Sequence, residues 1–150
     1  MMSNAFLISL FLIIGMYTCP AQIIDNLMLD ENEIPNDYTE TEQLSCITPN
    51  AFSLYDQSEL YENSVGKVVR KSFQTFQKKG DCGTVLYFEF EDEFKAKAFL
   101  DNMLWGKADR PTKNEQDNYY AKGKILVIWS FQMHSPIEGI SREKVMKLLR

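Results

Sequence analysis

The sequence predicts an α+β fold, with a small, mainly antiparallel sheet of about three strands packed by three to four helices. Three observations predict it. Thr48 followed by Pro49 is a helix-start pattern, Gly83–Phe90 alternates with the period of a strand, and two further strand-like runs flank a Lys-Gly turn. A chain of 150 residues has the length of one domain and can bury a sizeable core. The expected order is helix, helix, strand, helix, strand, strand, helix.

The beginning of the chain has the composition of a secretory leader. No charged side chain precedes Asp25, and Phe6–Met16 is an apolar run of the length that a signal peptide requires. The small residues Cys19 and Ala21 flank a proline as at a cleavage site. We therefore expect residues 1–21 to be a cleaved signal peptide and the remainder to be periplasmic or extracellular, with no membrane contact afterwards. An uncleaved membrane anchor and a lipidated Cys19 are the alternatives, and both also export the remainder.

Two cysteines, Cys46 and Cys82, remain once the leader is removed. An even number of cysteines in an oxidising compartment predicts a disulfide. In the chain-entropy model, closing a loop of about 37 residues stabilises the fold by about 4 kcal/mol. Two buried, unpaired thiols are the alternative.

Charge is unevenly distributed along the chain. Residues 22–66 contain ten acidic residues and no Lys or Arg, whereas all sixteen bases and eleven acids follow. We expect residues 22–47 to form an acidic, mobile arm before a globular domain at residues 48–150. The arm either lies on the basic domain or acts as a solvated linker. Asp30–Gln43 begins like half a calcium loop, but Ile34 occupies a ligand position, so no metal is predicted.

The first two helices are expected to follow this arm. Thr48 is a suitable N-cap for a helix from Pro49 to about Asn63. Apolar residues at helical spacing and a terminal glycine predict a second helix over about Lys67–Lys79. A strand is the competing interpretation of this second segment, because it contains two adjacent valines.

A strand and a helix are expected next. Gly83–Phe90 places Leu86, Phe88 and Phe90 on a core face, whereas Val85, Tyr87 and Glu89 are expected on a partly wet face. Residues 91–106 have an apolar stripe, acidic residues in the expected first turn and a terminal glycine, which together predict a helix.

The end of the chain predicts a hairpin and a last helix. Two strands are expected around a turn at Lys122 and Gly123. Ile125–Ile128 is apolar without alternation, which predicts a strand inside the sheet that is covered on both faces. A short helix is expected to begin at Ser141, because bases gather toward its C-terminus.

The best candidate binding surface surrounds a polar stretch, Lys107–Asn118, that contains no large apolar residue. Loops of this length are often functional, and aromatic side chains beside mixed charge are typical of protein interfaces. The alternative is that the aromatic residues belong to the core and the loop is merely solvated. The predicted surface consists of Trp105, Lys107, Arg110, Lys113, Tyr119 and Tyr120.

Catalytic signals are weak. His134 is the single histidine, which excludes sites built from several histidines, and no phosphate-binding or nucleophile-elbow motif occurs. A Cys82 and His134 pair is conceivable, but it competes with the disulfide. No cofactor is predicted. The net charge of −5 and the scattered bases argue against a nucleic-acid partner.

These observations together predict an exported, non-enzymatic domain that binds another protein. An inhibitor or immunity-type protein that meets a secreted toxin or hydrolase has this size and composition. The alternatives are a carrier with an apolar pocket between the sheet and the Lys67–Lys79 helix, and an enzyme that uses the Cys82 and His134 pair.

Overall fold

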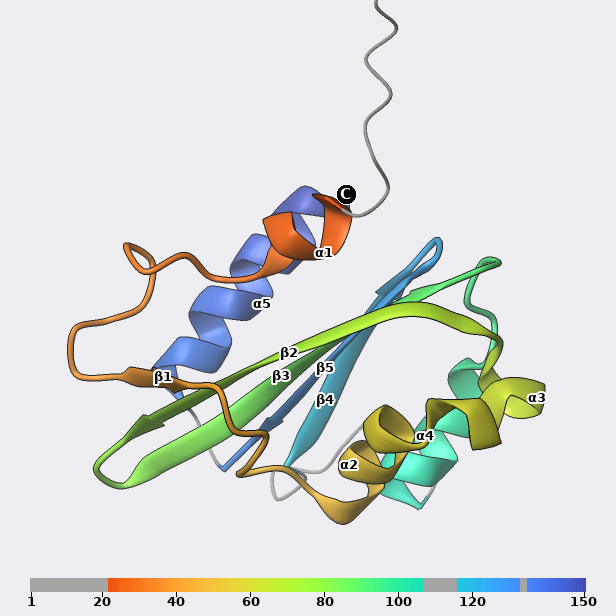
Figure 1. Cartoon of the computed structure of the whole chain (residues 1–150), viewed down its shortest axis with the longest axis horizontal. Helices are drawn as coiled ribbons and strands as arrows, with labels where there is room; N and C mark the ends of the chain where they lie inside the picture. The colour runs from red at the N-terminus through yellow and green to blue at the C-terminus, as the bar shows by residue number, and fades with distance from the viewer. Residues whose placement is uncertain (1–21, 107–115, 133–134) are drawn as a thin grey trace, which may run out of the picture.

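The computed structural model describes residues 22–106, 116–132 and 135–150 as a five-stranded antiparallel sheet between two layers of helices (Figure 1). The strands lie in the order β1-β2-β3-β5-β4. The predicted α+β class and antiparallel sheet are confirmed. The described residues contain five strands rather than about three, and five α-helices rather than three to four. The predicted signal peptide, residues 1–21, lies outside them.

The strands are β1 Thr39–Thr41, β2 Val68–Lys78, β3 Asp81–Phe90, β4 Asp117–Lys122 and β5 Ile125–Phe131. The helices are α1 Gln22–Leu27, α2 Pro49–Asp56, α3 Glu62–Val65, α4 Lys97–Trp105 and α5 Pro136–Leu148, with a 3-10 turn, η1, at Ser58–Tyr61. No helix within the described ranges is long and apolar enough to cross a membrane.

Both faces of the sheet are covered. α1 and α5 lie on one face, where Val85, Tyr87 and Trp129 are buried, and α2, α3 and α4 lie on the other, over Leu86 and Phe88 (Figure 1). The prediction of a partly wet β3 face is therefore wrong. The reason is that α1 and α5 form a second helical layer over that face. For β5 the prediction is confirmed, because it lies between β3 and β4 and is buried on both faces.

The predicted helix over Lys67–Lys79 is wrong, because most of that segment is β2. β2 pairs with β3 from Val68↔Phe90 to Lys78↔Asp81, and the two-residue turn between them has Gly80 at φ 80°. The pairing shifts register just after Val68, where an extra residue enters the strand. Beyond the bulge, Phe73 and Phe76 pack on opposite faces of the sheet, and their spacing of three residues imitates one face of a helix in the sequence.

Residues 22–47 are packed against the sheet, which is the arrangement expected if the acidic arm lies on the basic domain. α1 and the segment after it bury Ile24, Leu27 and Leu29, and β1 pairs with β2. Ion pairs join the segment to the basic part of the chain, among them Asp25–Arg70 at 2.7 Å, Asp37–Lys78 at 3.2 Å and Glu33–Lys144 at 2.6 Å. The hydrogen bond from Lys144 lowers the pKa of Glu33. Burial of three large side chains offsets the ordering cost of an otherwise acidic segment.

A polar row runs across the sheet under the chain that leads to α2. It consists of Thr75, Thr84, Ser130 and Asp117, which the registers place side by side, and all four are buried. Residues 42–48, the crossing segment, satisfy this row. Thr84 Oγ1 donates to the carbonyl of Ser45, and Thr48 N donates to Ser130 Oγ at 3.0 Å.

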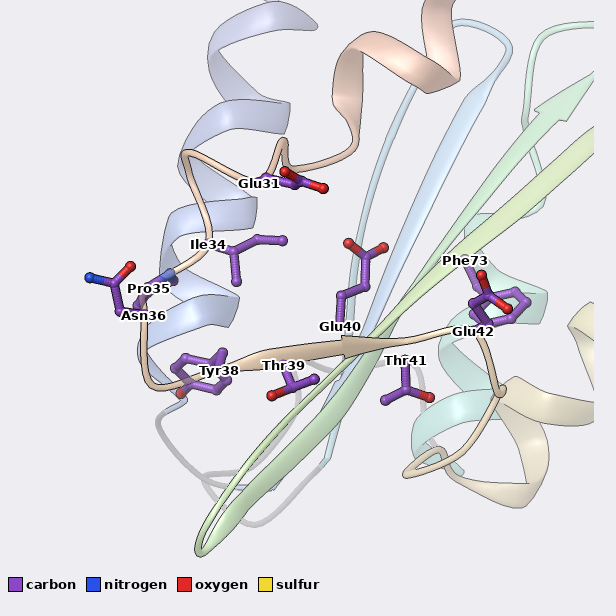
Figure 2. A pocket seen from close by; sticks show the side chains of 10 residues that line it. All are labelled: Glu31, Ile34, Pro35, Asn36, Tyr38, Thr39, Glu40, Thr41, Glu42 and Phe73. Atoms are coloured by element: carbon purple, nitrogen blue, oxygen red, sulfur yellow. The ribbon is translucent and has the colours of Figure 1, made fainter.

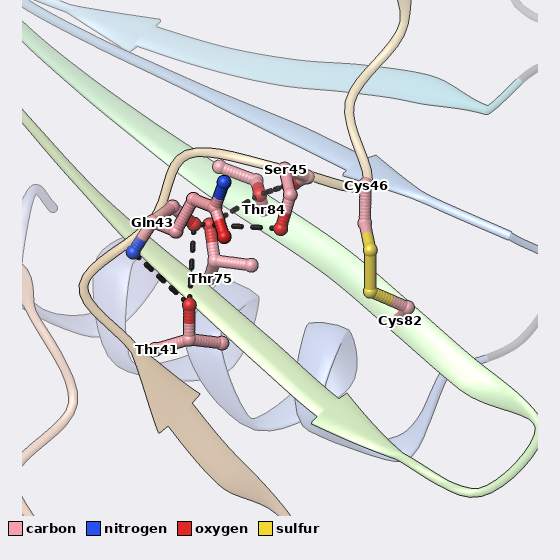
Figure 3. Close-up of a disulfide and its surroundings, with 7 residues drawn as sticks. All are labelled: Thr41, Gln43, Ser45, Cys46, Thr75, Cys82 and Thr84. Carbon is pink, nitrogen blue, oxygen red and sulfur yellow. Dashed lines mark hydrogen bonds between the residues drawn. A yellow bond between two sulfur atoms is a disulfide. The ribbon is translucent and has the colours of Figure 1, made fainter.

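The predicted disulfide is present between Cys46 and Cys82, with Cα atoms 5.7 Å apart. Figure 3 shows it joining the crossing segment to the start of β3, beside the Thr75 and Thr84 hydroxyls. Cys46 has a φ of 53°, in the left-handed region that most side chains avoid. The disulfide therefore holds the crossing segment at its only non-glycine position of positive φ among the described residues.

The predicted helix start at Thr48 and Pro49 is confirmed. Ala51 N donates to Thr48 Oγ1 at 3.3 Å, and Thr48 Oγ1 donates in turn to Asp117 Oδ2. The helix is shorter than predicted: α2 ends at Asp56, and η1 and α3 replace its second half.

Two other helices differ from prediction at their starts. α4 begins at Lys97 rather than near residue 91, because Phe94 N donates to the carbonyl of Gly123 at 2.8 Å and holds the connection on the β4–β5 turn. Its predicted end is confirmed, since Gly106 adopts a φ of 68° there. α5 begins at Pro136 rather than Ser141, because Ser135 and Pro136 supply an earlier start.

Replacing Thr48 by alanine should lower the free energy of unfolding by about 1–2 kcal/mol, because one hydroxyl caps α2 and also contacts the buried Asp117. Urea denaturation of Thr48→Ala and wild type measures the change. Thr48→Ser keeps the hydroxyl and is the matched control, so it should lose much less. Equal losses in the two variants would contradict this role for the hydroxyl.

Candidate functional site

A groove of about 390 Å³ lies beside the edge strand β4, and we call it the β4 groove. It lies where the start and the end of α4 meet the strand. Its lining residues are Phe94, Lys97, Trp105, Tyr119, Tyr120 and Ala121.

Trp105 and Tyr119 form the aromatic wall of the groove. Trp105 is the last residue of α4, and the turn at Gly106 directs the chain away from it. Its ring stacks on that of Tyr119 with centroids 5.4 Å apart and planes inclined by 26°. Trp105 Nε1 donates to the carbonyl of Asp117 at 2.9 Å, which fixes the indole against the strand. Both side chains are half-buried, so part of each ring faces solvent.

A carboxylate holds the polar end of Tyr119. The Tyr119 hydroxyl donates to Asp101, and Lys97 Nζ lies 3.1 Å from the other oxygen of that carboxylate and 5.7 Å from the Tyr119 ring centroid. Burial and the hydrogen bond to Asp101 raise the pKa of Tyr119 well above its usual value. The hydroxyl therefore stays protonated and keeps the ring in one orientation.

The structure brings together only part of the predicted surface. Trp105 and Tyr119 are in contact, as the prediction requires. Tyr120 also lines the groove, but it packs against the core cluster on the other face of the sheet. The three bases of the predicted surface, Lys107, Arg110 and Lys113, lie outside the described residues.

Sequence reasoning missed two lining residues, Phe94 and Lys97. The apolar stripe of the predicted helix placed Phe94 in the core, and Lys97 carried no signal beyond its charge. The hydrogen bond from Phe94 N to the carbonyl of Gly123 holds the chain before α4 at the β4–β5 turn, and Lys97 lies beside the Tyr119 ring through its pairing with Asp101. Of the six residues that line the groove, none is a Ser, Cys, His, Asp or Glu. The described surface offers ring area and a cation, which suits binding.

A second concavity, the acidic cleft, has a volume of about 670 Å³ and lies between β1 and the loop before it. Figure 2 shows Glu31, Ile34 and Glu40 pointing into this space, with Glu42 beside Phe73 at the far end of β1. The three carboxylates are exposed, and Glu40 accepts a hydrogen bond from Gln74 Nε2 at 3.1 Å. No group of three or more His, Cys, Asp or Glu within the described ranges could hold a metal ion.

Of the alternative catalytic pair, Cys82 and His134, only Cys82 is among the described residues. Cys82 is joined to Cys46, so its sulfur is not a free thiolate. His134 lies outside the described residues. The small cavity beside the disulfide, about 190 Å³, is lined by the two cysteines and by Ile47, Gln116, Ser130, Phe131 and Gln132.

The sequence matches no family model, no curated protein and no solved structure.

Proposed function

We propose that this chain is an exported, non-enzymatic domain that binds another protein, of the inhibitor or immunity type that meets a secreted toxin or hydrolase. The β4 groove is the single observation that carries the proposal. It combines two stacked aromatic rings, a cation and an edge strand in one place. Fixed, partly exposed aromatic residues of this kind supply much of the binding energy at protein interfaces.

Two further observations support the proposal. The disulfide is the kind of bond that persists in oxidising compartments outside the cytosol, which fits export. The Trp105 and Tyr119 rings are already held by hydrogen bonds to Asp117 and Asp101, so little side-chain entropy is lost when a partner covers them.

The carrier hypothesis loses its expected pocket. That pocket required a helix over Lys67–Lys79 standing off the sheet, but Val68–Lys78 is a strand within the sheet. The enzyme hypothesis required a free Cys82, which the disulfide removes.

Charge reversal in the polar stretch that follows Trp105 in the sequence tests the predicted surface. We expect the triple variant Lys107→Glu, Arg110→Glu, Lys113→Glu to capture its partner from extract of the source cells about ten-fold less well than wild type, because charges at an interface rim set association rates. The measurement is affinity capture with quantitative mass spectrometry.

The matched control carries the same change in net charge elsewhere: Lys67→Glu, Lys79→Glu, Lys147→Glu. All three lysines are exposed, and none of them lines the β4 groove. The control should capture the partner as wild type does. Unchanged capture by the Lys107→Glu, Arg110→Glu, Lys113→Glu variant would reject the predicted surface. Failure of wild type to enrich any protein would reject the proposed function.

A further inference from the structure

We infer that the partner binds by adding an extended, acidic segment as a sixth strand to the outer edge of β4. This inference rests on the proposed function and names the chemistry of its partner. It follows from which backbone groups of β4 point outward, which of them are already satisfied, and which charges surround them.

The pairing register of β4 with β5 shows which backbone groups of β4 point to its outer edge. Phe131 N donates to the carbonyl of Gln116 at 3.1 Å, so Gln116 and Phe131 form a hydrogen-bonded pair of the β4–β5 ladder. Hydrogen-bonded pairs alternate along an antiparallel ladder. Asn118, Tyr120 and Lys122 therefore bond to β5, and the backbone groups of Asp117, Tyr119 and Ala121 point to the outer edge.

Part of this edge is already capped. The carbonyl of Asp117 accepts from Trp105 Nε1, and Tyr119 N donates to the Asn118 side chain at 3.0 Å. The carbonyl of Tyr119 and both backbone groups of Ala121 have no partner among the residues that the structure describes. These three groups and the neighbouring groove make a short docking edge, and an incoming strand can also replace the local bond made by Asn118.

The side chains beside this edge determine which residues the added strand should contain. Every second residue of an added strand would face the same side as Tyr119, where Trp105 and Phe94 offer an apolar wall. The predicted ligand is therefore a strand with an apolar or aromatic residue at a position that faces the groove.

The charges indicate acidic flanks. Lys95, Lys97, Lys122 and Lys124 lie at the start of α4 and at the β4–β5 turn, and all four are exposed. Lys97 is paired with the buried Asp101 at 3.1 Å, Lys95 with Glu93 at 3.9 Å, and Glu91 with Lys67 at 3.7 Å, whereas Asp92 is exposed. Lys122 and Lys124 make no ion pair with the described residues, so they are the cations that remain to attract an acidic segment. The opposite edge of the sheet is β1, whose Glu40 and neighbouring Glu42 are exposed. An acidic segment is thus attracted to β4 and repelled from β1.

Selection of short random peptides displayed on phage against the intact protein tests the inference. We expect the enriched peptides to combine Asp or Glu with a large apolar residue. In the complex with an enriched synthetic peptide, amide hydrogen exchange at Ala121 should slow about ten-fold or more, because its outward N–H gains an acceptor. The amides of Tyr120 and Lys122 already donate to β5 and should change little.

A matched pair of variants tests the charge. Lys122→Glu, Lys124→Glu should weaken peptide binding about ten-fold. Lys79→Glu, Lys147→Glu makes the same change in net charge at other exposed positions and should leave binding unchanged. Thermal unfolding of both doubles checks that each is folded.

The failures of the two proposals are distinguishable. Enrichment of basic peptides, or a bound peptide without slower exchange at Ala121, would overturn strand addition while capture of a partner from extract would still support the proposed function. Slow exchange at Ala121 without peptide, together with a dimeric mass in sedimentation, would show that a second copy occupies the edge and would also overturn the inference.

Discussion

Removing the Cys46–Cys82 disulfide should lower the free energy of unfolding by about 4 kcal/mol. The two cysteines are 36 residues apart, and releasing that loop restores conformational entropy to the unfolded chain. The double variant Cys46→Ser, Cys82→Ser, compared with wild type by urea denaturation, measures the loss. The free energy of unfolding should also fall more steeply with urea concentration, because the unfolded chain without the disulfide exposes more surface.

Reductant provides the internal control. Wild type should lose the same stability when dithiothreitol is added, and the double serine variant should not respond to it. A loss below about 1 kcal/mol would contradict the loop-entropy argument. It would indicate that the contacts of the crossing segment with the polar row hold the loop closed without the covalent bond.

Gly83→Ala is expected to lower the free energy of unfolding by about 3 kcal/mol. Gly83 lies opposite Phe131 across the β3–β5 ladder, and a Cβ at this position would come closer than 3.0 Å to three atoms of the Phe131 ring. Phe131 is only 3% exposed, so the ring has little room to move. Denaturation curves of the variant measure the loss.

Gly139→Ala is the matched control, because the same substitution is made where a Cβ meets nothing within 4 Å. Gly139 lies inside α5, so alanine there should raise stability by about 0.5–1 kcal/mol. The two variants therefore test opposite signs of one chemical change. Equal effects of both would show that Phe131 does not restrict position 83.

The parts of the fold that the sequence predicts well are those decided locally. β3 and β5 are recognised as strands from residue patterns within a short window, and Thr48 with Pro49 is a local start signal. For β2 the sequence supports a strand only as the competing interpretation, because Phe73 and Phe76 lie on opposite faces of the sheet at a helix-like spacing and the pairing with β3 decides the conformation.

The segment before α2 depends on partners that are distant in sequence. Gln74 accepts from Leu29 N at 2.8 Å and donates to the carbonyl of Leu29 at 2.9 Å, across 45 residues. These contacts order a stretch whose own composition favours a mobile chain. A prediction from local composition counts the acidic residues there and misses the burial of Ile24 and Leu27.

The residues of the candidate site are also only partly predictable from the sequence. Trp105 and Tyr119 could be singled out because they flank a polar stretch, and they are in contact. Asp101, the partner of the Tyr119 hydroxyl, could not, since its proximity to Tyr119 depends on how α4 lies on β4. The acidic cleft was missed because its carboxylates were assigned to a mobile arm, whereas β1 holds Glu40 at the sheet edge.

The polar row also restricts how the sheet can assemble. A slip of one residue in β3, β5 or β4 would turn Thr84, Ser130 or Asp117 to the opposite face. The crossing segment would then face apolar side chains in place of its hydrogen-bond partners, which are 39 to 82 residues away in the chain. It can dock only on a sheet whose pairings are all native, so formation of the disulfide selects correctly registered molecules during oxidative folding.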